Sequence, residues 1–476
     1  PRRSAQGQGS KSKLSGPPRR SAQGQGSKYK RAIAATAAIL CLALPSAHAD
    51  GCPFGFDLAS SPAAAASPDL GAHLRSLQAS KGVQAGAEPL SWGTRVPDRQ
   101  GYDGYGNNAL DASNGAAGVM RRAAPATYSD GFGRMEFARP NPVAVSEAMC
   151  AAPSAAGVRD TGDNALSDLV VFFGQHISHE IAHSGGKACP IEALPIPNPG
   201  QARIQGKVPF QRTRFVGGKG PNSQREQLSA VSAFIDGSAI YGNTKAHADK
   251  LRAYEGGRLA TLADGAHDTV DQGMETLPRR SSGGGDPGDI NMVNPVRRPD
   301  GTYFELGNNR GNESPGLLTL QVMWVREHNR HAGRIAAADP DATDEEVYQA
   351  ARRWTIATQQ RLTLEYLSVL GIDLGEYAGY DPTVDARVAN EFATAAMRFG
   401  HSMVSPMTLR GTYVGDSQLG TGCASLQETE PLRLCSHFFS PEHVIGPSGS
   451  LTAVLRGVIG SVAQAVDTVV VDDLRT

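Results

Sequence analysis

Four stretches of the chain carry apolar residues at helical spacing, and each predicts an amphipathic helix. They are residues 163–183, 314–338, 343–371 and 385–403. The first has its apolar stripe at positions 169, 170, 173, 177 and 181. The third opens with Thr343 three residues before Glu346, the pattern of a capping box, and stops at Gly371. The last is expected to end at His401.

The remainder of the chain has little periodicity. Residues 50–160 are rich in Ala, Gly, Pro and Asn, and residues 256–316 hold many Gly- and Pro-containing turns. Strand-like runs are few and short. We therefore expect a mainly α-helical fold: a single large domain with long loops, its N-terminal part at 50–160 and its catalytic part at 161–476.

The N-terminus is expected to lie outside this domain. "PRRSAQGQGSK" occurs twice, and residues 1–27 are interpreted as a low-complexity extension that is not native. Residues 28–49 combine a basic start, an apolar run and Ala47-His48-Ala49. This order is typical of a secretory signal cleaved after Ala49, and its apolar run is too short to span a bilayer. The sequence thus predicts a secreted or periplasmic protein.

Charge and cysteine content narrow the possible partners. Lys plus Arg (46) nearly balances Asp plus Glu (47), which argues against nucleic acid or an anionic membrane as a partner. An oxidising compartment permits disulfides. Cleavage at Ala49 would leave an odd number of cysteines: Cys52, Cys150, Cys189, Cys423 and Cys435. Proximity in the sequence favours a pair between Cys423 and Cys435.

The stretch "FFGQHISHEIAH" (172–183) is compatible with two chemistries. His179, Glu180 and His183 spell H-E-x-x-H, the helical motif of zinc metalloproteases, although Cys189 stands where one large class has its third histidine. Alternatively, Gln175 and His179 share one helix face and would lie against a flat haem. The motif alone leaves both open.

Six blocks of sequence decide in favour of haem, because they resemble, in order, the animal-type haem peroxidases of the peroxidase–cyclooxygenase superfamily. The blocks are "FFGQHISHEI", "SAFIDGSAIYGNT" (232–244), "NRGNESPGLLTLQVMWVREHNRHA" (309–332), residues 346–371, "AMRFGHSM" (396–403) and residues 438–476. The resemblance, closest to a bacterial-like secreted member, runs from roughly residue 90 to the end. It implies hydrogen peroxide-dependent oxidation of halide, thiocyanate or a phenolic donor through an oxo-ferryl intermediate, as in the response to oxidative stress.

The same resemblance implies a role for each matching residue. His179 is the expected distal acid/base, Gln175 its polar neighbour and Arg310 the catalytic cation. On the other side of the haem b, His401 is the expected iron ligand and Arg398 the partner of a propionate. Glu313 stands where the family ester-links the haem. Calcium would be bound by Glu180, Ser232, Phe234 (through its carbonyl), Asp236 and Ser238, and hard oxygen ligands suit that ion.

Departures from the family pattern set further expectations. Ser178 stands where many members have a second esterifying aspartate, so at most one link, through Glu313, is expected. Glu180 replaces an aspartate. Arg398 occupies the position of the cyclooxygenase tyrosine, which argues against fatty-acid oxygenation. The chain ends before the asparagine that supports the proximal histidine, and we expect a C-terminally truncated domain. A haem-free binding or adhesion module is therefore kept as an alternative.

Overall fold

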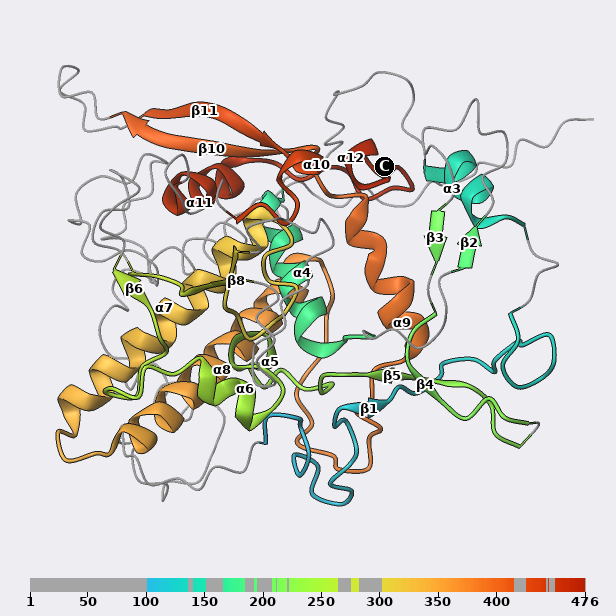
Figure 1. Cartoon of the computed structure of the whole chain (residues 1–476), viewed down its shortest axis with the longest axis horizontal. Helices are drawn as coiled ribbons and strands as arrows, with labels where there is room; N and C mark the ends of the chain where they lie inside the picture. The colour runs from blue at the N-terminus through green and yellow to red at the C-terminus, as the bar shows by residue number, and fades with distance from the viewer. Residues whose placement is uncertain are drawn as a thin grey trace, which may run out of the picture.

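The computed structural model describes most of the chain from residue 101 onward (Figure 1). The described residues are 101–135, 140–150, 166–184, 192–194, 208–210, 212–220, 222–263, 275–281, 302–414, 425–441, 444 and 450–475. The predicted N-terminal extension and signal segment lie outside these residues, as do Cys52, Cys189 and Cys423. The mainly α-helical fold with few short strands is confirmed.

Three helices form the centre of the domain: α4 (Asp168–Ile181), α7 (Pro315–Ala338) and α8 (Asp344–Val369). α7 and α8 lie side by side, and α4 packs against α7 (Figure 1). Each helix begins where a hydroxyl side chain accepts a main-chain N–H: Ser167 for α4, Ser314 for α7 and Thr343 for α8. The predicted capping box of Thr343 and Glu346 is confirmed.

The main core lies between these helices. α4 contributes Leu169, Phe172, Phe173 and Ile177, three of which belong to the predicted stripe, and α7 contributes Leu318, Leu320, Val322 and Trp324. Deleting one such buried large side chain costs about 2–5 kcal/mol. This packing fixes the position of α4 and, with it, the direction in which its polar face points.

Shorter elements surround the centre. The helices are α3 (Pro142–Cys150), α5 (Ser238–Tyr241), α6 (Lys245–Lys250), α9 (Asn390–Thr394), the 3-10 helix η1 (Ala396–His401), α10 (Leu434–His437), α11 (Leu451–Gly460) and α12 (Asp472–Arg475). The strands form antiparallel sheets: β1 (Gly118–Val119), β5 (Glu226–Ser229) and β4 (Phe215–Val216); β2 (Glu192–Leu194) with β3 (Val208–Phe210); β6 (Leu262–Ala263) with β7 (Glu275–Thr276); β8 (Arg279–Ser281) with β9 (Thr302–Phe304); and β10 (Met407–Val414) with β11 (Ser425–Arg433).

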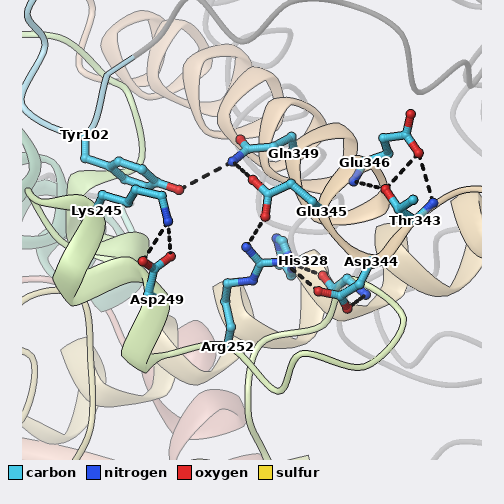
Figure 2. Close-up of polar contacts among 11 residues, drawn as sticks. Tyr102, Lys245, Asp249, Arg252, His328, Thr343, Asp344, Glu345, Glu346 and Gln349 are labelled. Atoms are coloured by element: carbon cyan, nitrogen blue, oxygen red, sulfur yellow. Dashed lines mark hydrogen bonds and ion pairs between the residues drawn. The ribbon is translucent and has the colours of Figure 1, made fainter.

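A buried arginine joins the loop after α6 to the start of α8 (Figure 2). The Arg252 guanidinium donates to Asp344 at 2.6 Å and also pairs with Glu345. It stacks over the Tyr348 ring with 4.1 Å from its central carbon to the ring centroid. The nearby ion pair between Lys245 and Asp249 joins two residues of the same helix, α6, and is far more exposed to solvent (Figure 2).

The helix predicted over 385–403 is wrong in its extent. It is replaced by α9 and η1, which are separated at Ala395, where φ is −130° and ψ −66°. The residues before α9 pair instead with the N-terminal part of the domain: Arg121 N–H donates to Val388 O, and Asn390 N–H donates to Arg121 O. This long-range pairing outweighs the local helical preference.

The predicted Cys423–Cys435 disulfide is also wrong, because Cys435 carries a free and exposed thiol. Cys435 follows the far end of β11, a nine-residue strand that begins at Ser425. Cys423, its expected partner, lies outside the described residues. Closeness in sequence was therefore a misleading signal.

Among the described helices, none combines the length and apolar character that crossing a bilayer requires.

Candidate functional site

The H-E-x-x-H motif does not form the geometry of a zinc protease. α4 ends at Ile181, and Ala182 is extended with φ −150° and ψ 129°, so His183 is not one helical turn beyond His179. The Glu180 carboxylate accepts main-chain N–H groups and is fully buried. No cluster of three potential metal-binding His, Cys, Asp or Glu side chains occurs in the described part of the chain. The arrangement therefore argues against the metalloprotease alternative.

The polar face of α4 instead meets the segment that leads into α7. Gln175 Nε2 donates to Glu313 Oε2 at 3.0 Å, and Ser314 Oγ donates to Gln175 Oε1 at 3.1 Å. His179 Nε2 lies 3.4 Å from the same Glu313 oxygen. On its other side, His179 Nδ1 lies 2.6 Å from the Asn308 side-chain amide. Gln175, His179 and Glu313 thus form one hydrogen-bonded cluster.

Arg310 places a cation at the end of α4. Its guanidinium donates to the carbonyl of Ala182 at 3.2 Å and lies 3.5 Å from that of His179, where the helix dipole favours positive charge. Burial and the charge of Arg398 lower the pKa of Arg310 to about 10, while Glu313 acts in the opposite direction. Arg310 therefore remains charged at neutral pH, and its Nε has no partner in the described part of the structure.

The two groups next to this cation differ in charge at neutral pH. Burial, together with Arg310, lowers the pKa of His179 to about 4, so the imidazole is neutral. Burial acts to raise the pKa of Glu313, but hydrogen bonding to His179 and the charge of Arg310 hold it below its usual value. The cluster is therefore a neutral imidazole beside a carboxylate and a guanidinium.

Arg398 and His401 lie on η1, which packs against α4 away from α7 (Figure 1). Both side chains are exposed. Partial burial and Arg398 lower the pKa of His401, whereas the charge of Glu313 raises it. Neither side chain makes a hydrogen bond or an ion pair with any described residue. The fold thus brings both residues of the predicted proximal side to the helix that bears His179, and leaves an imidazole and a guanidinium there for a ligand.

The predicted calcium residues also come together. Ser232 Oγ donates to Asp236 Oδ2 at 2.5 Å and lies 3.4 Å from the carbonyl of Phe234. Ser238 Oγ donates to the main-chain carbonyl of Glu180 at 2.9 Å. Several hard oxygen donors therefore lie within a few residues of one another, and they suit a divalent cation in chemical type.

The sequence predicts the Glu180 carboxylate as a calcium ligand, whereas in the structure it accepts hydrogen bonds from the main chain. It accepts the N–H groups of Asp236, Gly237, Ser238 and Ala239 at 2.5–3.0 Å. The left-handed conformation of Gly237, with φ 82°, turns successive N–H groups toward the carboxylate. Burial and the nearby Asp236 raise the pKa of Glu180 to about 7. Burial raises the pKa of Asp236 to about 6.

Two residues of the cluster were not predicted from the sequence. Ser314 precedes Pro315, a common start of a helix, so this serine was recognisable as a cap but not as a partner of Gln175. Asn308 stands two residues before Arg310, where asparagine commonly forms a turn with the main chain. Its contact with His179 depends on the tertiary fold, and no local signal announces it.

Comparison with known proteins gives a consistent result. Residues 99–476 match the animal haem peroxidase family. The chain is 33% identical over 394 residues to dual oxidase 1 of Caenorhabditis elegans, an alignment that covers 79% of this chain and 25% of that protein. It is 33% identical over 401 residues to dual oxidase 2 of Homo sapiens, with 79% and 24% covered. The chain thus spans about a quarter of the length of these curated relatives.

Solved structures agree with the family match. Peroxidase A from Dictyostelium discoideum is similar with a TM-score of 0.68 and 26% identity, covering 80% of this chain and 71% of that chain. A fatty acid alpha-dioxygenase from Oryza sativa has a TM-score of 0.57 and 18% identity, covering 77% of this chain and 59% of that one. The second likeness concerns the fold alone.

Proposed function

Because the chain belongs to the animal haem peroxidase family, we propose that it uses hydrogen peroxide to oxidise a small reducing substrate: halide, thiocyanate or a phenolic donor. The observation that carries the proposal is the arrangement around α4. His179 and Arg310 lie at its end beside Glu313. His401, whose side chain has no hydrogen-bond or ion-pair partner among the described residues, lies on η1, which packs against the same helix.

The side chains present fit a haem in chemical type. The His401 imidazole is the proposed iron ligand, since a histidine is a usual proximal ligand. The Arg398 guanidinium is suited to a haem propionate, because guanidinium groups bind carboxylates in a bidentate manner. Glu313 is the one carboxylate of the cluster available for an ester link, since Ser178 cannot form one. When bound, haem supplies the redox chemistry that protein side chains lack.

The remaining residues of the cluster bind peroxide and handle its proton. The neutral His179 is the proposed group for proton exchange. Glu313 lies beside its Nε2 and orients the ring, and Gln175 holds Glu313 in place through a hydrogen bond. The Arg310 guanidinium stabilises negative charge that develops as the O–O bond breaks, because its donors are already fixed by the end of α4.

We also propose two accessory features. Calcium is the proposed ion at this site, and its proposed ligands are oxygen atoms of Ser232, Phe234, Asp236 and Ser238. Glu180 contributes through its main-chain carbonyl. Export to the periplasm or outside the cell is proposed from residues 28–49, which have the order of a signal segment.

Absorption spectroscopy of protein expressed with haem supplied tests this function. We expect a Soret band that shifts when peroxide is added, and its loss in His401→Ala. His437→Ala is the matched control, because His437 is a half-buried histidine on α10 whose ring Nδ1 lies within hydrogen-bond distance of the carbonyl of Arg433. Acid–acetone extraction of wild type and Glu313→Gln then tests the ester link. Soluble, folded protein without a Soret band would refute the peroxidase function and favour the haem-free binding module.

A further inference from the structure

The loop that follows α8 presents large apolar side chains to solvent. Every residue from 371 to 381 is exposed. Tyr377 has 79% of its surface exposed, Leu374 has 62%, and Val384 further along the loop has 58%. A single exposed apolar residue is ordinary in a folded protein, whereas several of them in one segment are typical of an interaction site.

Hydrogen bonds hold this loop against the N-terminal residues of the described chain (Figure 1). Asn108 Nδ2 donates to the carbonyl of Pro382 at 2.9 Å, and Asn114 Nδ2 donates to that of Val384 at 2.8 Å. Leu110, which is 70% exposed, lies between these two asparagines in the sequence. The loop therefore has a defined position, and the two segments together form one surface.

This surface, which we call the Tyr377 surface, consists of residues 103–114 and 371–385 and is acidic. It contains six Asp and Glu residues and no Lys, Arg or His, although the whole chain has a formal charge of only -1. A hydrogen bond from Thr383 holds the pKa of Asp381 below its usual value, so this carboxylate is ionised at neutral pH. At the border of the surface, Arg387 pairs with Asp385 at 2.8 Å.

We propose that the Tyr377 surface binds a cationic protein segment that carries apolar side chains. Tyr377 and Leu374 provide its apolar contacts, since tyrosine is enriched among the residues that dominate binding energy. Glu376, which lies between them in the sequence, provides an ionic contact.

The charge of the surface distinguishes this partner from others. A second copy of the chain, docked by two-fold symmetry, would place acidic residues against acidic residues. Nucleic acid and anionic membranes carry the same sign of charge as the surface and are repelled by it. The proposed site requires neither haem nor peroxide, so its failure and that of the peroxidase function are separate outcomes.

Hydroxyl-radical footprinting of the full chain tests the site, with a synthetic helical peptide of lysine and leucine as the probe. We expect Tyr377 and Leu374 to react in the protein alone and to be protected when the peptide is added. Tyr254, which is 59% exposed and lies outside the Tyr377 surface, is the internal control and should react equally in both samples. Protection of Tyr377 before the peptide is added would show that another part of the chain or a second copy covers it, and would overturn the proposal.

Fluorescence anisotropy of the labelled peptide separates the apolar contact from the ionic one. Tyr377→Ser should weaken binding at least about tenfold, and Glu376→Lys should weaken binding and reduce its dependence on salt. Val466→Ser is the matched control, because Val466 is 60% exposed and lies outside the Tyr377 surface; it should bind like wild type. Equal affinity for Tyr377→Ser and wild type, or equal binding of a peptide with glutamate in place of lysine, would overturn the proposal.

Discussion

Replacing Gly316 with alanine tests how closely α4 and α7 must approach. A Cβ atom at Gly316 would lie 2.4–2.6 Å from three atoms of the Phe172 ring, which belongs to α4 and is 6% exposed. That distance is shorter than any ordinary carbon–carbon contact, so Gly316→Ala requires the ring or the whole of α4 to move. The crossing lies two residues beyond Ser314, whose hydroxyl donates to Gln175.

The magnitude follows from two opposing effects. Overpacking a close-packed contact costs about 1–3 kcal/mol, while alanine in place of glycine in a helix contributes up to about 1 kcal/mol. We expect Gly316→Ala to lower the free energy of unfolding by up to about 2 kcal/mol, the difference between the two. Gly333→Ala in the same helix is the control, because a Cβ there meets no atom within 4 Å. It should raise the free energy of unfolding by about 0.5–1 kcal/mol.

Urea unfolding followed by circular dichroism measures both variants under one set of conditions. Two chemically identical changes in one helix should therefore change the free energy of unfolding in opposite directions. If Gly316→Ala stabilises the protein as much as Gly333→Ala does, α4 and α7 do not cross as closely as described.

Three further outcomes are expected. Burial lowers the pKa of His328 from 6.5 to about 3. Its contribution to the free energy of unfolding is therefore fully present above pH 6.5 and is lost as the pH falls toward 3, by about 1.4 kcal/mol per pH unit. Urea unfolding that gives the same free energy at pH 7 and at pH 5 would contradict this. Arg252→Ala should lower the free energy of unfolding by about 2–4 kcal/mol, since its guanidinium is buried between two carboxylates. Lys245→Ala should lower it by less than about 1 kcal/mol, because the Lys245–Asp249 pair is exposed. Similar losses for the two variants would refute this difference. Added calcium should raise the melting temperature and a chelator lower it in wild type but not in Asp236→Asn, and insensitivity of wild type would refute the calcium site.

The central helices were predictable because local and tertiary preferences agree in them. α4, α7 and α8 carry their apolar stripes on the faces that are buried, and their capping residues stand where the periodicity begins. The spacing of Gln175 and His179 placed both on one face, and their shared contact with Glu313 confirms it.

The errors arose where distant parts of the chain decide the structure. Residues 387–390 pair with Arg121, more than 260 positions away, and no window of the local sequence contains that information. Cys435 was misassigned because closeness in sequence does not by itself bring two cysteines into bonding contact. Asn308 was missed for a related reason: its side chain is oriented by Arg310 nearby, but the histidine that it contacts lies 129 positions earlier.

Arg310 has a consequence for how this domain can change during evolution. One side chain closes the carbonyl end of α4 and also provides the positive charge beside His179. If Arg310 has the catalytic role proposed above, selection for a stable fold and selection for turnover act on the same position. A library of variants chosen only for solubility should still retain arginine at 310, even in lineages that have lost every trace of activity.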